Sequence, residues 1–128
     1  MGILAWIVDR MPSKQRAHWH YRRGLLHARF KKHQAANAEY SAVIELESVP
    51  AELRAMALFN RALVSYAAGA ELDAIRDLSE VLAMNDIAEN VKTEARRKLV
   101  RMERTSERGD SPNSNVSSLP PEESHASP

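Results

Sequence analysis

The chain has 128 residues, a formal net charge of +1 and no cysteine; 44% of its residues are hydrophobic and 27% are charged. This length suits one domain, and the composition is neither collagen-like nor that of a wholly disordered chain. The absence of cysteine excludes disulfides, thiolate zinc sites and cysteine nucleophiles, and it suits a reducing compartment such as the cytoplasm. Only four residues are glycine and 5% are aromatic, which disfavours a β-sandwich and favours an all-α fold.

Charge alternates along the chain. Residues 10–33 hold eight Lys or Arg and no acid, residues 34–90 hold three Arg and ten acids, and residues 92–104 hold six Lys or Arg and two Glu. The near-neutral total disfavours a dedicated nucleic-acid-binding protein. The basic helix expected over 10–33 is a solvated face in one interpretation, and in the other it binds RNA or another anionic surface.

The chain divides into an N-terminal apolar segment (1–12), a helical domain (13–107) and an acidic Ser/Pro-rich tail (108–128) that we predict to be disordered. The apolar run at 3–8 is far shorter than the ~20 residues of a membrane span, and it lacks the features of a signal peptide. We expect a short helix there that packs its apolar side on the domain. Membrane contact through residues 1–8 is the less favoured alternative.

Apolar periodicity predicts five helices in the central domain, at 13–32, 35–47, 51–68, 71–84 and from 86 onward. Ser13 is expected to cap the first helix, and residues 86–89 resemble a capping box. The first helix has two apolar stripes, which indicates two buried sides. These stripes are Ala17, Tyr21, Leu25 and Ala28, and Trp19, Leu26 and Phe30. The fourth helix is expected to turn Leu72, Ile75, Leu78 and Leu82 inward.

The first two helix pairs are related by an offset of 38 residues. Gly24 falls on Ala62, and in the second helices Ala36 falls on Ala74 and Tyr40 on Leu78. A small residue in the first helix lets the two helices of a pair approach closely. We therefore predict a repeated helix-turn-helix unit, and such units stack because neither buries its apolar face alone.

This pattern resembles the tetratricopeptide repeat (TPR) family, with two degenerate repeats and a capping helix over residues 17–86 and beyond. The closer match is the stretch 58–69 followed by Ala74 and Leu78, although Leu58, Arg61 and Asp86 replace the family's Trp, Leu and Pro. The resemblance implies an all-α fold, a short right-handed α-α superhelix of TPR-like hairpins, with about five helices plus a short N-terminal helix. A plain helical bundle is the alternative.

The resemblance also implies a function: a non-catalytic protein–protein interaction module, an adaptor, scaffold or assembly factor, that binds a partner peptide or subunit in a concave groove. Asn60 matches one position of the family's carboxylate clamp, and Lys92 with Arg96 offers a basic pair, while Tyr21 and Leu25 replace the clamp's other Lys and Asn. An acidic peptide is favoured. The predicted peptide-binding residues are Tyr21, Arg22, Leu25, Arg29, Phe59, Asn60, Leu63, Tyr66, Lys92 and Arg96.

Motifs for catalysis, cofactors and metals are not found in the sequence, so we do not expect an enzyme. His20 and His27 lie seven residues apart, which is not the spacing of a helical zinc pair. The expected partner is a protein or peptide. Homodimerisation through an end surface, either the apolar N-terminus or the fifth helix, is left open.

Overall fold

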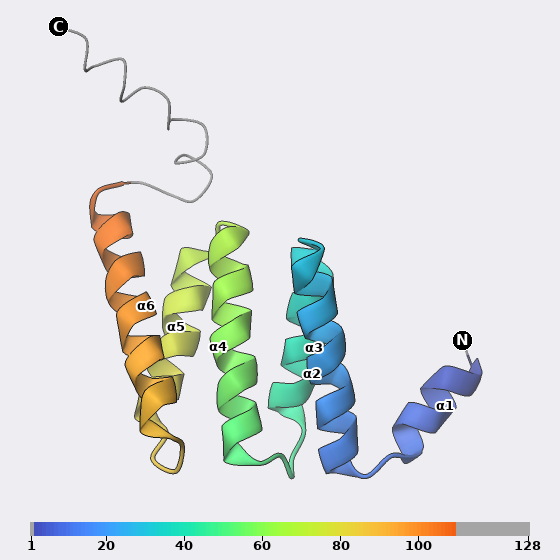
Figure 1. Ribbon diagram of the computed structural model, residues 1–128. Helices are drawn as coiled ribbons and strands as arrows, with labels where there is room; N and C mark the ends of the chain where they lie inside the picture. Colours follow the sequence, from blue (N-terminus) through green and yellow to red (C-terminus); the bar gives the residue numbers. More distant parts are fainter. Residues whose placement is uncertain (1, 110–128) are drawn as a thin grey trace, which may run out of the picture.

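The computed structural model describes residues 2–109 and contains six α-helices and no strand in that range (Figure 1). The helices are α1 (Gly2–Arg10), α2 (Ser13–Arg29), α3 (His33–Glu45), α4 (Ala51–Ala67), α5 (Glu71–Ala83) and α6 (Glu89–Glu107). The prediction of an all-α fold with five helices after a short N-terminal one is confirmed. The disordered tail predicted over 108–128 lies outside the described residues, apart from Arg108 and Gly109.

The helices form two antiparallel hairpins and a final single helix. α2 packs on α3 and α4 packs on α5, while α3 also contacts α4 and α5 contacts α6. α2, α4 and α6 stand in one row, with α3 and α5 behind it, and α1 projects from the end of the row beside α2 (Figure 1). Neighbouring helices of the row also touch, because α2 contacts α4 and α4 contacts α6.

The bounds of the helices repeat at the offset that the sequence indicates. α2 and α4 have 17 residues each, and α3 and α5 have 13 each. α2, α4 and α6 begin at Ser13, Ala51 and Glu89, so each begins 38 residues after the one before. The turn inside each hairpin has positive φ at its middle residue, Lys31 at 59° and Gly69 at 92°. α6 therefore has the register of the first helix of a third unit.

Each hairpin closes on a small residue in its first helix. A Cβ atom on Gly24 would lie 2.5 Å from Cε1 of Tyr40, whose side chain is completely buried. Ala62 and Leu78, their counterparts, are completely buried as well. Burial, with a smaller contribution from nearby Tyr21, raises the pKa of Tyr40 to about 12. The two hairpins thus use the same contact with side chains of different size.

An ion pair also repeats at the 38-residue offset. Arg23 Nε lies 3.0 Å from Glu39 Oε2, and Arg61 Nε lies 2.8 Å from Asp77 Oδ2. The first pair is partly exposed, whereas Asp77 is buried. Nη1 of Arg61 also donates to the hydroxyl of Ser41 on α3 at 2.9 Å, so this arginine joins the two hairpins.

The ionisation of Glu39 reflects two opposed effects. Burial raises the pKa of its carboxyl. The hydrogen bonds from His20 and Arg23 and the charges of these two residues lower the pKa by more in total, so it lies below its ordinary value. Nδ1 of His20 lies 2.7 Å from Oε1 of Glu39. This histidine, for which the sequence indicates no carboxylate neighbour, therefore belongs to the α2–α3 contact.

Several expectations about apolar side chains are wrong. Leu26 and Phe30 of the second stripe predicted for α2 are exposed, as is Leu25 of the first stripe, because no helix packs on that side of the first helix in the row. Trp19, the remaining residue of the second stripe, is partly buried. Leu72 is exposed because the buried face of α5 consists of Ala74, Asp77, Leu78 and Val81, and Leu72 lies outside that face. Ile3, Leu4, Trp6 and Ile7 of α1 are exposed too, so the prediction that the apolar side of this helix packs on the domain is wrong for these side chains.

The two predicted helix caps are also wrong. Ser13 is the first helical residue of α2, and α6 begins at Glu89 with Ala88 as its N-cap; neither cap makes a side-chain hydrogen bond. The carbonyl of Pro12 instead accepts from the N–H of Arg16 at 2.9 Å. The repeat register thus sets where the helices begin, and local capping chemistry does not.

Candidate functional site

A hollow of about 460 Å³ lies between α4 and α6. Met56, Phe59 and Leu63 of α4 line one wall, and Asn90, Val91, Glu94 and Lys98 of α6 line the other. Phe59, Leu63 and Val91 also pack on the core cluster built around Leu58 and Leu78, so the apolar floor is held by the fold. Glu94 and Lys98 place opposite charges beside it. We call this hollow the α4–α6 groove.

Between α2 and α4 the molecule fills the corresponding space with its own side chains. Nδ2 of Asn60 donates to the hydroxyl of Tyr21 at 3.0 Å and to the carbonyl of Met56 at 2.9 Å. Burial raises the pKa of Tyr21, and the hydrogen bond from Asn60 offsets part of that rise. Because both amide hydrogens of Asn60 are in use, this residue could donate to a partner's carboxylate only after one of these two bonds breaks.

The structure divides the ten predicted residues among several places. Phe59 and Leu63 meet in the α4–α6 groove, and Tyr66 packs on the same core cluster. Tyr21 and Asn60 bond each other, and Arg22, Leu25 and Arg29 are exposed along α2. Lys92 is half-buried, and neither it nor Arg96 lines the groove.

The basic side chain that does reach the groove from α6 is Lys98. The 38-residue offset could have found it, since it aligns Asn60 with Lys98 and Met56 with Glu94. The predicted basic pair, Lys92 and Arg96, does not follow the repeat register, because Asn60 and Met56 align with Lys98 and Glu94.

Arg96 lies in a separate hollow of about 370 Å³ that α6 lines alone. Its other residues are Thr93, Arg97, Val100, Arg101 and Arg104. Val100 lies 38 residues after Ala62, as Ala62 lies 38 residues after Gly24, and the two earlier residues contact the second helix of their hairpins. In residues 2–109 no second helix follows α6, and Val100 is exposed.

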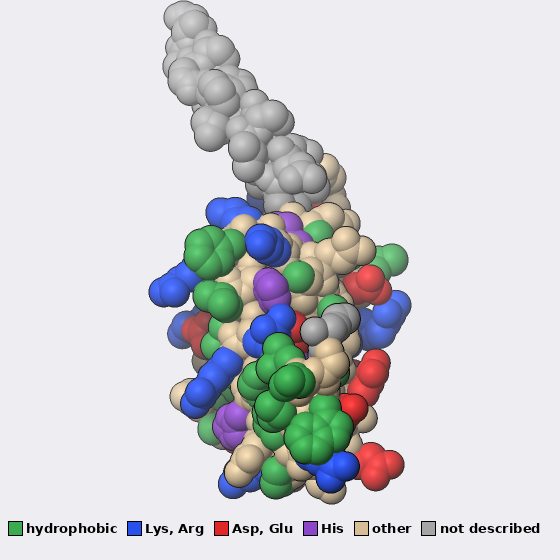
Figure 2. All heavy atoms as spheres, turned by 90° about the vertical axis from the view of Figure 1, so that its right-hand side faces the viewer, with side chains coloured by type: hydrophobic (Ala, Val, Ile, Leu, Met, Phe, Trp, Pro, Cys, Tyr) green, Lys and Arg blue, Asp and Glu red, His purple; other side chains and the backbone are tan. Residues whose placement is uncertain are grey.

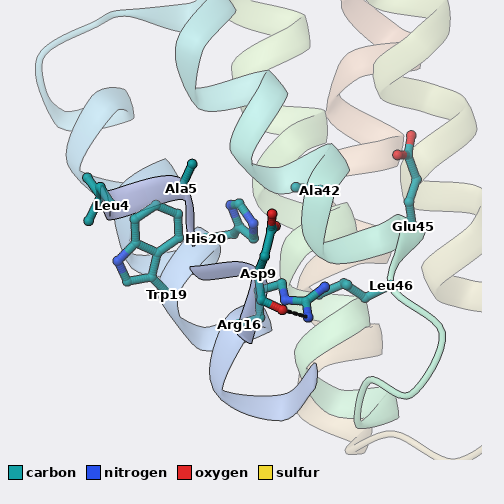
Figure 3. A pocket seen from close by; sticks show the side chains of 9 residues that line it. All are labelled: Leu4, Ala5, Asp9, Arg16, Trp19, His20, Ala42, Glu45 and Leu46. Carbon is teal, nitrogen blue, oxygen red and sulfur yellow. Dashed lines mark hydrogen bonds between the residues drawn. The ribbon is translucent and has the colours of Figure 1, made fainter. Parts of the chain in front are cut away.

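A third hollow, of about 680 Å³, lies where α1 meets the first hairpin (Figure 3). It is lined by Leu4, Ala5, Asp9, Arg16, Trp19, His20, Ala42, Glu45 and Leu46. Nη2 of Arg16 donates to the carbonyls of Asp9 and Met11, each at 3.1 Å, and so holds the end of α1. Arg54, its repeat counterpart, donates to the carbonyls of Ile44 and Leu46 at the end of α3.

In the part of the chain that the structure describes, no three His, Cys, Asp or Glu side chains are placed to hold a metal ion. Over the same residues, no helix has both the length and the apolar character needed to cross a bilayer. Comparison with known proteins finds no matching family model, no matching curated protein and no matching solved structure.

Proposed function

We propose that this chain is a TPR-like, non-catalytic protein–protein interaction module that binds an extended segment of a partner protein in the α4–α6 groove. The observation that carries this proposal is the groove itself. It has an apolar floor, it opens between two helices related by the 38-residue offset, and it is lined by Phe59 and Leu63, two residues that the resemblance assigns to peptide binding.

The chemistry of the groove favours a segment with an apolar anchor and acidic neighbours. Met56, Phe59 and Val91 offer a surface for one apolar side chain. Lys98 lies beside it, and Glu94 is paired with Arg97 at 2.7 Å, so Lys98 supplies the positive charge that an acidic group of the partner would meet. Charge complementarity then selects an acidic partner and sets its direction in the groove.

Site-specific crosslinking tests where the partner binds. A photoreactive amino acid at Met56, in the groove, is expected to capture a partner segment from the native cell. The same amino acid at the exposed Leu72, on α5, serves as the control and is not expected to capture that segment.

A peptide synthesised from the captured segment then tests the groove chemistry. The change Lys98→Glu is expected to weaken its affinity by about tenfold, because a favourable charge contact becomes a repulsive one. The matched change Arg101→Glu, on α6 outside the groove, is expected to alter the affinity less than about twofold. Fluorescence anisotropy gives both values, and circular dichroism checks that helicity is retained. Equal losses from the two changes, or capture only from Leu72, would refute the groove assignment.

A further inference from the structure

Ile3, Leu4, Trp6 and Ile7 of α1 are exposed at one end of the molecule. The exposed fractions are 76% for Ile3, 54% for Leu4, 58% for Trp6 and 44% for Ile7. Figure 2 faces this end and shows hydrophobic side chains gathered over α1. Neither core cluster of the protein includes them. Apolar side chains concentrated on one short helix in this way mark an interaction site.

α1 is nevertheless held to the domain. Nη2 of Arg16 binds the carbonyls of Asp9 and Met11 at the end of the helix, so α1 is presented at a defined place beside α2. Leu4 and Ala5 reach the hollow next to Trp19, which leaves Ile3 and Trp6 as strongly exposed apolar groups (Figure 3).

Basic side chains are concentrated on one side of this apolar helix. Residues 2–32 contain eight Lys or Arg and one acid, Asp9. The exposed basic side chains are Arg10, Lys14, Arg22, Arg23, Arg29, Lys31 and Lys32. Glu39, the acid of α3 that faces α2, is already bound by His20 and Arg23. Glu45, an exposed acid at the end of α3, lines the hollow beside α1 and lies with Asp9 on the less basic side of this surface. In Figure 2 most of the Lys and Arg side chains lie on one side of the hydrophobic ones and above them, and Asp and Glu side chains lie on the other side. We call α1 with these basic side chains the N-terminal face.

We propose that the N-terminal face docks on an anionic lipid bilayer, with the apolar side chains of α1 in the interfacial region and the basic side chains of α2 on the headgroups. A bilayer satisfies both halves of the surface, since its interface takes up apolar side chains and its anionic lipids attract Lys and Arg. Trp6, with the guanidinium of Arg10 at 4.6 Å from its ring centre, suits the boundary between water and lipid.

Two other occupants fit less well. RNA would be attracted by the basic side chains but offers no apolar environment for the aliphatic Ile3 and Ile7. A second copy of the chain would cover the apolar groups only by bringing two strongly positive surfaces together, which costs free energy. The inference does not rest on the proposed function, because the α4–α6 groove lies at the other end of the row (Figure 1).

Vesicle sedimentation with the full chain is the test. We expect binding to phosphatidylcholine vesicles that contain about 30 mol% phosphatidylserine, weak binding to pure phosphatidylcholine, and a decrease in binding as salt rises from about 50 to about 500 mM. The double change Ile3→Ser with Trp6→Ser is expected to lower the affinity at least about tenfold, because it removes apolar groups from the interface. The change Leu72→Ser, at an equally exposed leucine of α5, is the matched control and is expected to have no effect.

A second pair of variants tests the charge. Lys14→Glu with Lys32→Glu reverses two charges on the N-terminal face, and Arg101→Glu with Arg104→Glu makes the same reversal on α6. The first pair is expected to lower vesicle binding by about tenfold or more, and the second by less than about twofold. Equal losses would show general attraction of a basic protein and would overturn the proposal.

The fluorescence of Trp6 reports the contact directly. In a Trp19→Phe background Trp6 is the remaining tryptophan, and its emission is expected to shift to shorter wavelength on anionic vesicles. Four outcomes would overturn the proposal: no binding to anionic vesicles at low salt, equal binding to neutral ones, full binding by the Ile3 and Trp6 double variant, or an RNA gel shift in the absence of vesicle binding. Without vesicle binding, a fall in the native mass of that double variant on light scattering would instead assign the surface to a second copy.

Discussion

Gly24 and Tyr40 show how two side chains set the distance between two helices. The ring of Tyr40 lies 2.5 Å from the place of a Cβ atom on residue 24, too close for that atom, and it is completely buried. In the second hairpin Ala62 takes the place of Gly24 and is slightly larger, and Leu78 takes the place of Tyr40 and is smaller. The total volume is shared differently, and the helices still pair in the same register.

At this scale we predict that Gly24→Ala destabilises the protein by up to about 2 kcal/mol. The buried aromatic ring blocks the added methyl group, which costs about 1–3 kcal/mol, and the gain of about 1 kcal/mol that alanine usually brings to a helix interior offsets part of this cost. The double change Gly24→Ala with Tyr40→Leu recreates the Ala62–Leu78 combination. We expect the double variant to lose less free energy of unfolding than the sum of the losses of the two single variants. Urea unfolding of the four proteins measures this coupling. Additive effects would contradict the prediction.

The two hairpins have ion pairs at equivalent positions but in different environments. Arg61 makes two hydrogen bonds to the buried Asp77, at 2.8 and 2.9 Å, and a third to Ser41 of the preceding hairpin. The hydrogen bond with Asp77 is the main reason that the pKa of Arg61 lies above its ordinary value. Arg23 bonds Glu39 on the surface of the first hairpin. The difference in burial therefore determines how much each ion pair contributes to the free energy of unfolding.

We predict that Arg61→Ala lowers the free energy of unfolding by about 3–5 kcal/mol, since it leaves the carboxylate of Asp77 buried without its partner. The same change at the repeat counterpart, Arg23→Ala, removes an exposed pair and is expected to cost less than about 1 kcal/mol. Thermal and urea unfolding compare the two variants under the same conditions. A loss at Arg23 as large as that at Arg61 would be inconsistent with the difference in burial.

The whole molecule joins a packed row of helices to one helix that contributes little to the core. α2 to α6 share two core clusters, while the large apolar side chains of α1 are exposed and Arg16 holds its end through backbone carbonyls. Stability is therefore uneven along the chain. The end that is least involved in the core is also the end that carries the surface proposed for membranes.

Hydrogen exchange of the full chain measures this difference. Amides of residues 2–10 are expected to exchange far faster than those of α4, because α1 can open without disturbing either core cluster. The double change Ile3→Ser with Trp6→Ser is expected to alter the free energy of unfolding by less than about 0.5 kcal/mol, as exposed substitutions usually do. Protection of α1 equal to that of α4 would show that this helix is part of the cooperative unit.

The sequence by itself determined the helices and their repeat. Apolar spacing and turn residues are properties of neighbours along the chain, and they predict six helices, close to the observed bounds. The comparison of Gly24 with Ala62 and of Tyr40 with Leu78 at one offset indicates the hairpins. The same offset applied to Arg23 and Arg61 would have revealed the repeated ion pair, because its partners Glu39 and Asp77 are also 38 residues apart.

Only the tertiary structure decided which surfaces are open. Leu26 and Phe30 have the spacing of buried residues, yet they face solvent, because exposure depends on whether another helix packs against that side. Asn60 is a residue type that can bind a peptide, yet both N–H groups of its side-chain amide donate to acceptors within the protein. Periodicity records which side chains share a helix face, whereas the packing of elements distant in sequence determines whether that face is covered.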